Sequence, residues 1–362
     1  MILSKQNRDR QLYFRIMLKK ITRYFCKAAT ASLVVLFLTT MASAKDFDDS
    51  EFQHITYPDW FIDNTFKDLS DDLETAITDG KKGLMIMFTT QGCSYCKMFL
   101  KVSLGNPRIA RAVQRNFDSL GLEIFDDAEM TQPDGTPTRV KHFAVNEGAA
   151  IAPSLLFYGP DGKRFLKLVG YKSPEHFENI ISFIEHRQPS EKFRDYLKRK
   201  AIEPIAKADY QLKSDPLFLP PPLQLASRQD KPLFVLFEAD NCLECSNFHK
   251  DVLALPEIRQ QLDKFNVARL DARDSTTLVT MPSGEKVTPQ QWYKNTDLIQ
   301  LPALLFYDDN GEFVTQTDSI TRRQRMLNLT GLVLDKKHKE GWNYQRYARS
   351  KAIERSLKKK QN

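Results

Sequence analysis

The sequence has few histidines, few cysteines and, after its first 44 residues, no long apolar run. Without such a run the later chain cannot cross a bilayer. The six histidines show no ligand-like clustering, and no Gly-rich phosphate loop, Ser/His/Asp signature or paired-carboxylate motif is present. These absences argue against a phosphate-loop nucleotide enzyme and against the common hydrolases, and we expect no metal site.

Excess positive charge is confined to the N-terminus. The chain carries 53 Lys and Arg against 46 Asp and Glu, a formal net charge of +7. Eight of those basic residues and one acidic residue lie in residues 1–44, so the remainder has 45 of each sign. A neutral remainder gives no general reason to expect nucleic acid as a partner.

Residues 1–44 resemble a secretory signal. Basic residues precede an apolar segment, Ala28–Thr40, that is too short for a comfortable membrane span, and Ala42-Ser43-Ala44 matches the small-x-small cleavage pattern. We expect cleavage after Ala44 and a periplasmic or otherwise exported protein that is not membrane-bound. An uncleaved N-terminal anchor is the alternative.

Four of the five cysteines form two Cys-x-x-C pairs, Cys93/Cys96 and Cys242/Cys245, and the fifth lies in the signal. This spacing indicates redox chemistry or metal binding. A static disulfide is one alternative, weakened because so short a loop removes little unfolded-chain entropy. A single Cys₄ zinc site is another, weakened because the pairs lie in separate halves of the chain.

An offset of 149 residues superimposes one half of the chain on the other. It places Cys93 on Cys242 and Pro153 on Pro302. It also superimposes, in order, Cys96 on Cys245, Pro107 on Pro256, Leu155–Tyr158 on Leu304–Tyr307, and Gly162 on Gly311. Further along, the offset becomes 151 and places Tyr196 on Tyr347. The pattern indicates a duplicated domain with a duplicated helical tail.

Both halves predict the same order of elements. Each half should have a buried strand, a helix that is opened by the Cys-x-x-C pair and interrupted by proline, a second strand, a hairpin and a closing helix. In the first half, the two strands, the hairpin and the closing helix are expected at Gly83–Thr89, Leu120–Phe125, Ser154–Tyr158 with Arg164–Val169, and Pro174–His186. In the second half, they are expected at Pro232–Glu238, Asn266–Leu270, Ala303–Tyr307 with Phe313–Thr317, and Thr321–Leu334. Phe66, Leu69, Leu73 and Ile77 fall at helical spacing and predict an amphipathic helix before the first strand.

This order, with a proline before the hairpin, resembles the thioredoxin superfamily over residues 65–187 and 225–334. The segment Phe88–Lys97 looks most like the SoxW-type periplasmic thioredoxins, and Phe237–Cys245 looks like a more divergent relative. The resemblance implies an α/β chain of two tandem thioredoxin-like domains, each a central mixed sheet flanked by helices.

The predicted domains follow from the repeat and the resemblance. They are a signal peptide (1–44), a first domain with an N-terminal extension (45–188), a helical and Pro-rich linker (189–224), a second domain (225–335) and a basic helical tail (336–362). We interpret the helical stretch Glu191–Ile205 as a solvated spacer. The charge of the tail is interpreted as a solvated face, with an acidic partner as the alternative.

The predicted chemistry is thiol–disulfide exchange. A cysteine at a helix start lies near the positive end of the dipole, which favours its thiolate. We therefore expect Cys93 to be the principal nucleophile and Cys96 its resolver. The pair Cys242/Cys245 should be slower, because Glu244 disfavours a neighbouring thiolate.

The resemblance also implies a substrate edge. In the family, the proline matching Pro153 and Pro302 is cis and lies against the disulfide, and the backbone beside it pairs with the substrate chain. That role passes to Ala152-Pro153 and Leu301-Pro302, and Tyr95 is positioned to flank a substrate.

The sequence also departs from the family. The tryptophan usual before the first cysteine is Gly92 in one half and Asn241 in the other. The acidic residue expected six positions before that cysteine is Met87 or Leu236.

We predict an exported disulfide reductase or isomerase that acts on protein thiols, with no cofactor beyond its cysteine pairs. By resemblance, its partners are protein thiols or disulfides and a membrane thiol-electron transporter. The alternative is a substrate-binding or chaperone-like thioredoxin-fold protein in which one or both redox sites are weakly active.

The mature protein is expected to begin near Lys45, because cleavage follows the small residues Ala42 and Ala44. N-terminal sequencing of the exported protein measures this directly. A mature chain that retains Leu33–Leu38 would show that the segment is an anchor.

Overall fold

The computed structural model describes residues 49–50, 53–63, 66–149, 151–202, 208–212, 214–226, 231–296 and 298–361. The predicted signal peptide and its cleavage site lie outside these residues. Residues 49–362 form one compact unit in which both halves of the repeat take part. Within the described residues, no helix combines the length and apolarity that a membrane span requires.

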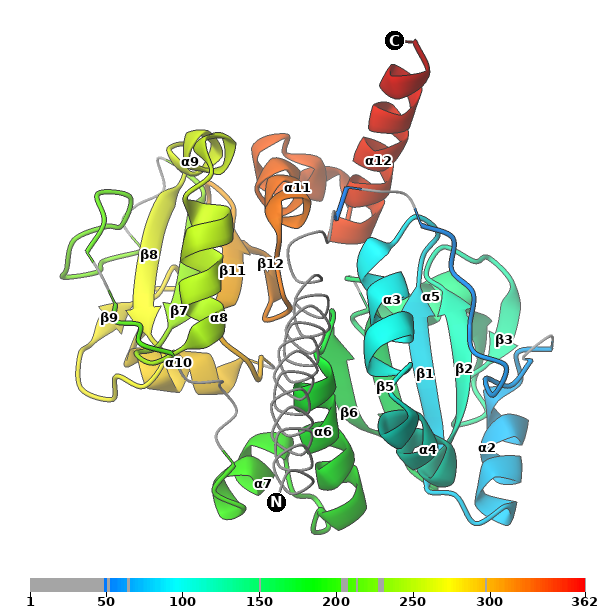
Figure 1. Ribbon diagram of the computed structural model, residues 1–362. Helices are drawn as coiled ribbons and strands as arrows, with labels where there is room; N and C mark the ends of the chain where they lie inside the picture. The colour runs from blue at the N-terminus through cyan, green and yellow to red at the C-terminus, as the bar shows by residue number, and fades with distance from the viewer. Residues whose placement is uncertain are drawn as a thin grey trace, which may run out of the picture. The chain divides into compact units, whose positions relative to one another are not determined.

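The first half is a four-stranded sheet with helices on both faces (Figure 1). Its elements are α2 (Leu69–Thr78), β1 (Gly83–Thr89), α3 (Ser94–Met98), a π-helical turn η1 (Phe99–Ser103), α4 (Pro107–Asn116), β2 (Phe117–Glu123), β3 (Glu129–Thr131), β4 (Pro137–Arg139), α5 (Val140–Asn146), β5 (Ser154–Tyr158), β6 (Arg164–Val169) and α6 (Pro174–His186). The strand order is β2-β1-β5-β6, with β1 parallel to β2 and antiparallel to β5.

The second half repeats this plan with the strand order β12-β11-β7-β8. After α7 (Phe193–Arg199), its elements are β7 (Leu233–Glu238), α8 (Leu243–Phe248), a π-helical turn η2 (His249–Leu253), α9 (Pro256–Leu262), β8 (Asn266–Asp271), β9 (Val279–Thr280), β10 (Lys286–Val287), α10 (Pro289–Asn295), β11 (Ala303–Tyr307), β12 (Phe313–Thr317), α11 (Arg323–Leu334), a 3-10 turn η3 (Lys337–Glu340) and α12 (Tyr344–Gln361). The predicted mixed sheet flanked by helices is confirmed in both halves.

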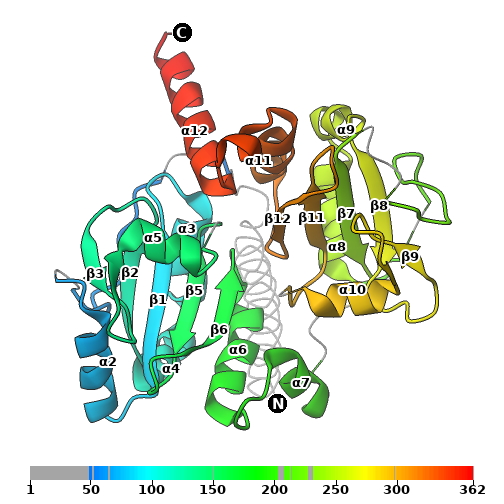
Figure 2. The ribbon, with the colours of Figure 1, turned by 180° about the vertical axis from the view of Figure 1, so that it is seen from behind.

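Alternate side chains of β7 enter two different cores. Val235 and Phe237 pack with Trp292 of α10 on one face of the sheet. Phe234 and Leu236 pack with α8, α9 and α11 on the other. Figures 1 and 2 show the ribbon of this half from opposite sides. A strand that is buried on both faces needs apolar residues at successive positions, which explains the continuous apolar run in the sequence.

Four predicted elements begin elsewhere. Strand β7 begins at Leu233 and helix α11 at Arg323, one and two residues after their predicted starts. Strand β2 starts at Phe117, three residues before the prediction, because the polar Asp118 and Ser119 are accommodated within the strand. Helix α2 starts at Leu69, so Phe66 precedes it and is 91% exposed. The helix turns Leu69, Leu73 and Ala76 inward, and Phe66 does not belong to the apolar face predicted for it.

The connecting helix and the tail are packed elements. The prediction of a solvated spacer is wrong for α7, which runs from 193 to 199 and buries Phe193, Tyr196 and Leu197. In the basic tail, α12 buries Tyr344 and Tyr347 in the same core as α11. Both helices therefore combine a charged face with an apolar face that packs on the protein.

A buried ion pair joins the two halves. The Nζ of Lys172, just after β6, lies 2.8 Å from the Oδ1 of Asp318, just after β12, and their side chains are 1% and 3% exposed. Close by, Gly170 adopts a φ of +75°, and an added Cβ would lie 2.1 Å from the Cβ of Ser319. A side chain at Gly170 would therefore separate the two halves at this contact.

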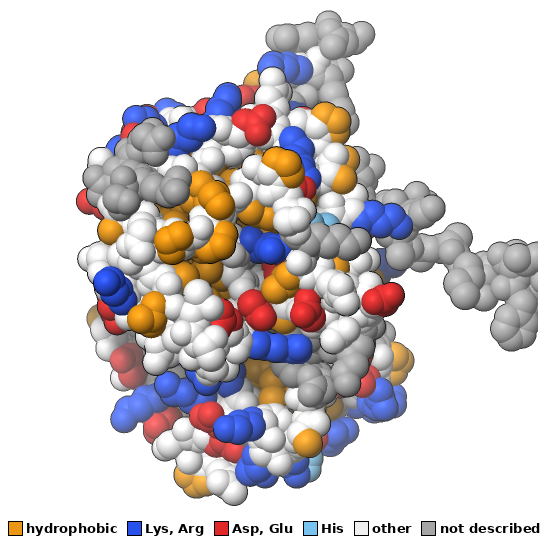
Figure 3. All heavy atoms as spheres, turned by 90° about the vertical axis from the view of Figure 1, so that its left-hand side faces the viewer, with side chains coloured by type: hydrophobic (Ala, Val, Ile, Leu, Met, Phe, Trp, Pro, Cys, Tyr) orange, Lys and Arg blue, Asp and Glu red, His pale blue; other side chains and the backbone are white. Residues whose placement is uncertain are grey.

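Charges of both signs are interspersed on the surface. Figure 3 shows Lys and Arg side chains alternating with Asp and Glu over the described part of one face. This distribution agrees with the equal numbers of acidic and basic residues that follow residue 44.

We expect Lys172→Met to destabilise the protein by about 3 to 5 kcal/mol, because it leaves the Asp318 carboxylate buried without its cation. Arg139→Met is the control, since its ion pairs with Asp127 and Glu129 are on the surface and should contribute about 1 kcal/mol or less. Urea unfolding gives both free energies. Equal costs for the two substitutions would contradict a special role for the buried pair.

Candidate redox sites

Both Cys-x-x-C pairs lie at helix starts. Cys93 precedes the first residue of α3, and its Sγ accepts a hydrogen bond from the backbone N–H of Cys96 at 3.1 Å. Cys242 stands in the same position before α8, and its Sγ accepts from the N–H of Cys245 at 3.0 Å. In the reduced protein, this N–H and the helix dipole favour a thiolate at the first cysteine of each pair.

Each pair forms its own disulfide, Cys93–Cys96 and Cys242–Cys245. The four sulfurs are therefore not gathered into one Cys₄ site. Within the described part of the chain, no three His, Cys, Asp or Glu side chains are grouped in a way that could hold a metal ion.

The peptide bonds Ala152–Pro153 and Leu301–Pro302 are both cis, as predicted. Each proline directly precedes the central hairpin strand, β5 or β11. Ala152 and Cys93 line the same cleft, so the structure brings the first proline loop and the first redox pair together.

The two sites differ in how far their first cysteine residues are exposed. Cys93 is 8% exposed, whereas Cys96, Cys242 and Cys245 are each 0% exposed. Because attack on an external disulfide needs an accessible sulfur, the first pair is better placed for exchange than the second.

A cleft of about 260 Å³ opens beside Cys93. One wall is formed by residues 91–95 and by Asp49, and the opposite wall by α11 and α12 of the second half. The first redox site is thus completed by elements that lie more than 200 residues further along the chain.

Tyr95 is buried at the floor of this cleft. Its hydroxyl donates to Asp49 Oδ2 at 2.9 Å and accepts from the backbone N–H of Arg322 at 3.0 Å. The guanidinium of Arg325 stacks 3.5 Å from the centre of its ring. Burial raises the pKa of this phenol well above 10, so the hydroxyl stays protonated. The ring predicted to flank a substrate therefore faces Arg325.

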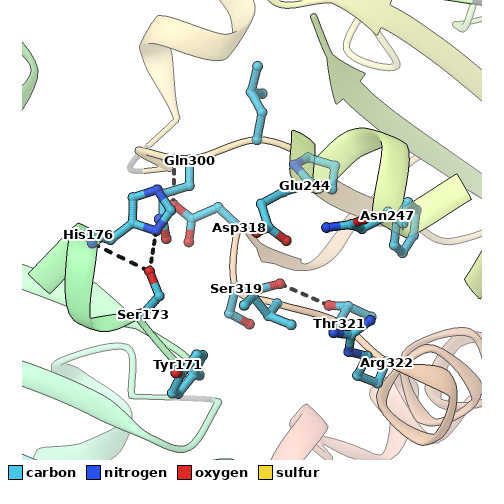
Figure 4. A pocket seen from close by; sticks show the side chains of 14 residues that line it. Tyr171, Ser173, His176, Glu244, Asn247, Gln300, Asp318, Ser319, Thr321 and Arg322 are labelled. Carbon is cyan, nitrogen blue, oxygen red and sulfur yellow. Dashed lines mark hydrogen bonds between the residues drawn. The ribbon is translucent and has the colours of Figure 1, made fainter. Parts of the chain in front are cut away.

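The pocket beside the second pair is smaller, about 30 Å³, and its lining includes Leu301 and Pro302 but neither cysteine. Figure 4 shows the pocket. Glu244 extends into it from α8, opposite His176 of the first half. Burial raises the pKa of the Glu244 carboxyl, and the Arg322 guanidinium opposes this shift without cancelling it.

A buried carboxylate near the second pair was not predicted. An acid was expected six positions before Cys242, where Leu236 stands, but Glu238 at the end of β7 is fully buried. Both of its carboxylate oxygens lie 2.9–3.0 Å from Nε2 of His249, and Tyr210 donates to it at 3.2 Å.

The internal repeat contains the signal that would have found this cluster. In the first half, the offset of 149 places Thr89 at the position of Glu238 and Leu100 at that of His249. Thr89 still bonds a tyrosine hydroxyl, that of Tyr57, at 2.5 Å. Where the first half has Thr89 and Leu100, the second half has Glu238 and His249, and these two contact each other.

Two helix-start disulfides, each with a cis-proline loop in its half, define a protein with two separate dithiol–disulfide centres. A family model described as a thioredoxin-like domain matches residues 69–185 and again residues 220–332. The chain therefore belongs to the thioredoxin-like domain family and carries two copies of the domain. The finer resemblance to SoxW-type thioredoxins stays a prediction.

Several solved structures are similar to part of the chain. A thioredoxin-fold protein from Helicobacter pylori is 15% identical, with 36% of this chain and 88% of that chain covered and a TM-score of 0.32. The reduced C-terminal domain of DsbD from Neisseria meningitidis is 20% identical, with 35% and 99% covered and a TM-score of 0.25. A disulfide isomerase from Xylella fastidiosa is 13% identical, with 41% and 99% covered and a TM-score of 0.24. No match was found among curated proteins.

We expect Glu244→Gln to stabilise the protein more at pH 7 than at pH 4. Burial raises the folded-state pKa of this acid above its unfolded-state pKa. The free energy of unfolding therefore falls as the pH rises between these two pKa values. Glutamine does not ionise and removes this loss. Urea unfolding at the two pH values measures the difference.

Glu257→Gln is the matched control with the opposite sign, because the Arg323 guanidinium lowers the pKa of Glu257. Its ionised form is favoured in the folded protein, so the substitution should cost more at pH 7 than at pH 4. A larger gain for Glu244→Gln at pH 4 than at pH 7 would contradict the assigned burial effect.

Proposed function

We propose that this protein is an exported thiol–disulfide oxidoreductase, a reductase or isomerase, that acts on protein thiols chiefly through Cys93 and Cys96. The observation that carries the proposal is the position of Cys93. It lies at the start of α3, is bonded to its partner cysteine, and lines a cleft from which Cys96 is absent.

In the reducing direction, the Cys93 thiolate attacks one sulfur of a client disulfide. A Cys93–client bond forms, and the other client sulfur leaves as a thiolate and takes up a proton. Cys96 then loses its proton and attacks Cys93 Sγ. The mixed bond breaks and the client leaves as a dithiol. The cysteine pair has lost two electrons to the client and is now a disulfide. A dithiol donor then reduces the pair again.

The second pair is proposed to react more slowly. Cys242 and Cys245 are both fully buried, and the pocket beside them does not reach either sulfur. The adjacent Glu244 adds a carboxylate that opposes thiolate formation when it is ionised.

Burial of the second pair also supports the second candidate, in which one half of the protein binds clients and has weak redox activity. An insulin-reduction assay with a regenerating donor separates the two candidates. No turnover, with client binding intact after all four cysteines are replaced by serine, would favour the binding protein.

Export is proposed from the signal-like residues 1–44. A reductase outside the cytosol needs a supply of electrons, and a membrane thiol-electron transporter is the proposed donor. The proposed clients are proteins with accessible thiols or disulfides.

We expect Cys96→Ala to trap mixed disulfides between Cys93 and client proteins, because no resolving thiol remains. Cys245→Ala should trap fewer, since Cys242 is buried. Mass spectrometry of the trapped adducts identifies the cysteine involved.

Iodoacetamide alkylation against pH ranks the two nucleophiles independently. We expect the Cys242 thiolate to form at a higher pH than the Cys93 thiolate, so that alkylation at neutral pH is slower at Cys242. A Cys242 thiolate that forms at lower pH than the Cys93 thiolate would overturn the ranking.

A further inference from the structure

Both backbone hydrogen-bonding groups of Ala152 are already occupied. Its N–H donates to Oε1 of Gln345 at 2.9 Å, and its C=O accepts from Nη2 of Arg325 at 3.1 Å. All three residues line the cleft that contains Cys93. The backbone edge next to the first disulfide is therefore hydrogen-bonded to side chains of the second half.

These two side chains are held firmly. Gln345 is in the first turn of α12 and is buried, between two tyrosines that anchor this helix in the second core. Arg325 is buried on α11, where it also donates to Ser319 Oγ at 2.6 Å and stacks on Tyr95. Ile151, the residue before Ala152, packs into the same core as α11 and α12.

The contact has a counterpart at the second site. The offset of 151 that relates the two tail helices places Arg194 of α7 at the position of Gln345. Arg194 donates to the carbonyl of Tyr293 in α10 and to that of Leu298, in the loop that leads to Pro302. Each tail helix therefore contacts the proline loop of the other half. The contact is present in both copies of the repeat.

The two counterparts engage different backbone groups. The arginine donates to carbonyls several residues before its proline, whereas the first site has both groups of the residue next to the proline occupied. A polypeptide that follows the cleft past Cys93 can accept from the N–H of Ala152 only by displacing Gln345, and it meets the Arg325 guanidinium at the carbonyl. Leaving either side chain buried without its partner costs free energy, so displacement is unfavourable.

We propose that Gln345 and Arg325 determine the specificity of the first redox site by excluding extended polypeptides from the edge at Ala152. This rests on the proposed function of Cys93. The substrate that fits is a small disulfide, or a disulfide in a mobile segment that reaches Cys93 without pairing along the backbone. Arginines outnumber aspartate among the charged residues of the cleft, three to one, which favours an anionic substrate such as glutathione disulfide.

The test compares two substrates at Cys93 in the full chain. Every variant carries Cys96→Ala, so that the adduct at Cys93 accumulates and is quantified by mass spectrometry. The substrates are glutathione disulfide and insulin, and the measured quantity is the ratio of the two rates. This ratio is insensitive to a general change in the reactivity of Cys93.

Gln345→Ala frees the N–H of Ala152, and we expect the insulin-to-glutathione ratio to rise about fivefold, the effect of one recovered hydrogen bond. Gln345→Glu keeps an acceptor for that N–H and should retain the original ratio when all variants are compared at high salt, where the added charge no longer repels glutathione disulfide. Arg346→Ala is the matched control on the same helix, because its side chain is exposed and lies over Trp342, outside the cleft.

An unchanged ratio in Gln345→Ala, with glutathione disulfide still reacting at Cys93, would overturn the specificity role and leave the proposed function standing. A rise that also appears in Gln345→Glu or Arg346→Ala would overturn it as well, because the effect would then not depend on the acceptor. No adduct at Cys93 with either substrate in any variant would overturn both the proposed function and this inference, whereas an adduct with insulin but none with glutathione disulfide would overturn this inference alone.

Discussion

The ion pair between Lys172 and Asp318 connects the parts of the molecule on which both redox sites depend. The second oxygen of the Asp318 carboxylate accepts the N–H groups of Ile299 and Gln300, which lead into the second proline loop. On the other side, Ser103 donates to the Lys172 carbonyl at 2.6 Å from the helical segment that follows the first cysteine pair. A buried charge pair is a poor source of net stability but a strong constraint on geometry, because either partner alone is unfavourable. The relative placement of the two halves is thus tied to the loops that border both disulfides.

The two redox sites share a backbone but differ in the groups buried near them. The first half places a hydroxyl, Thr89, and an apolar side chain, Leu100, where the second half places Glu238 and His249. Both halves keep a tyrosine hydroxyl bonded to the strand residue. Duplication therefore preserved the scaffold, while the ionisable groups diverged at positions that do not adjoin the cysteines in sequence. The properties of a Cys-x-x-C pair depend on such neighbours as well as on the two residues between the sulfurs.

Sequence predicted the local parts of this structure well. Apolar runs bounded by Gly, Pro and Asp turns located β5, β6, β11 and β12 at their observed bounds, because both the strand and its turns leave a short-range signal. The start of β2 and the exposure of Phe66 were predicted wrongly, since the apolar spacing was extended past a helix boundary and polar strand residues were left out. The contact of Gln345 with Ala152 joins residues 193 positions apart. No periodicity or motif reports a contact of that kind.

The repeat gives a physical reason for a basic helix at the end of the chain. The tail helix of each half does not cover its own proline loop but that of the other half, through Arg194 in one case and Gln345 in the other. A half taken alone would therefore lack one wall at its redox loop, and the two domains complete one another. The equivalent position on the two tail helices, Arg194 in one and Gln345 in the other, also acts in two ways. A guanidinium can only donate and so selects carbonyl groups, whereas an amide oxygen accepts and so selects an N–H. Changing one residue on a tail helix thus alters access to the distant site without touching the cysteines.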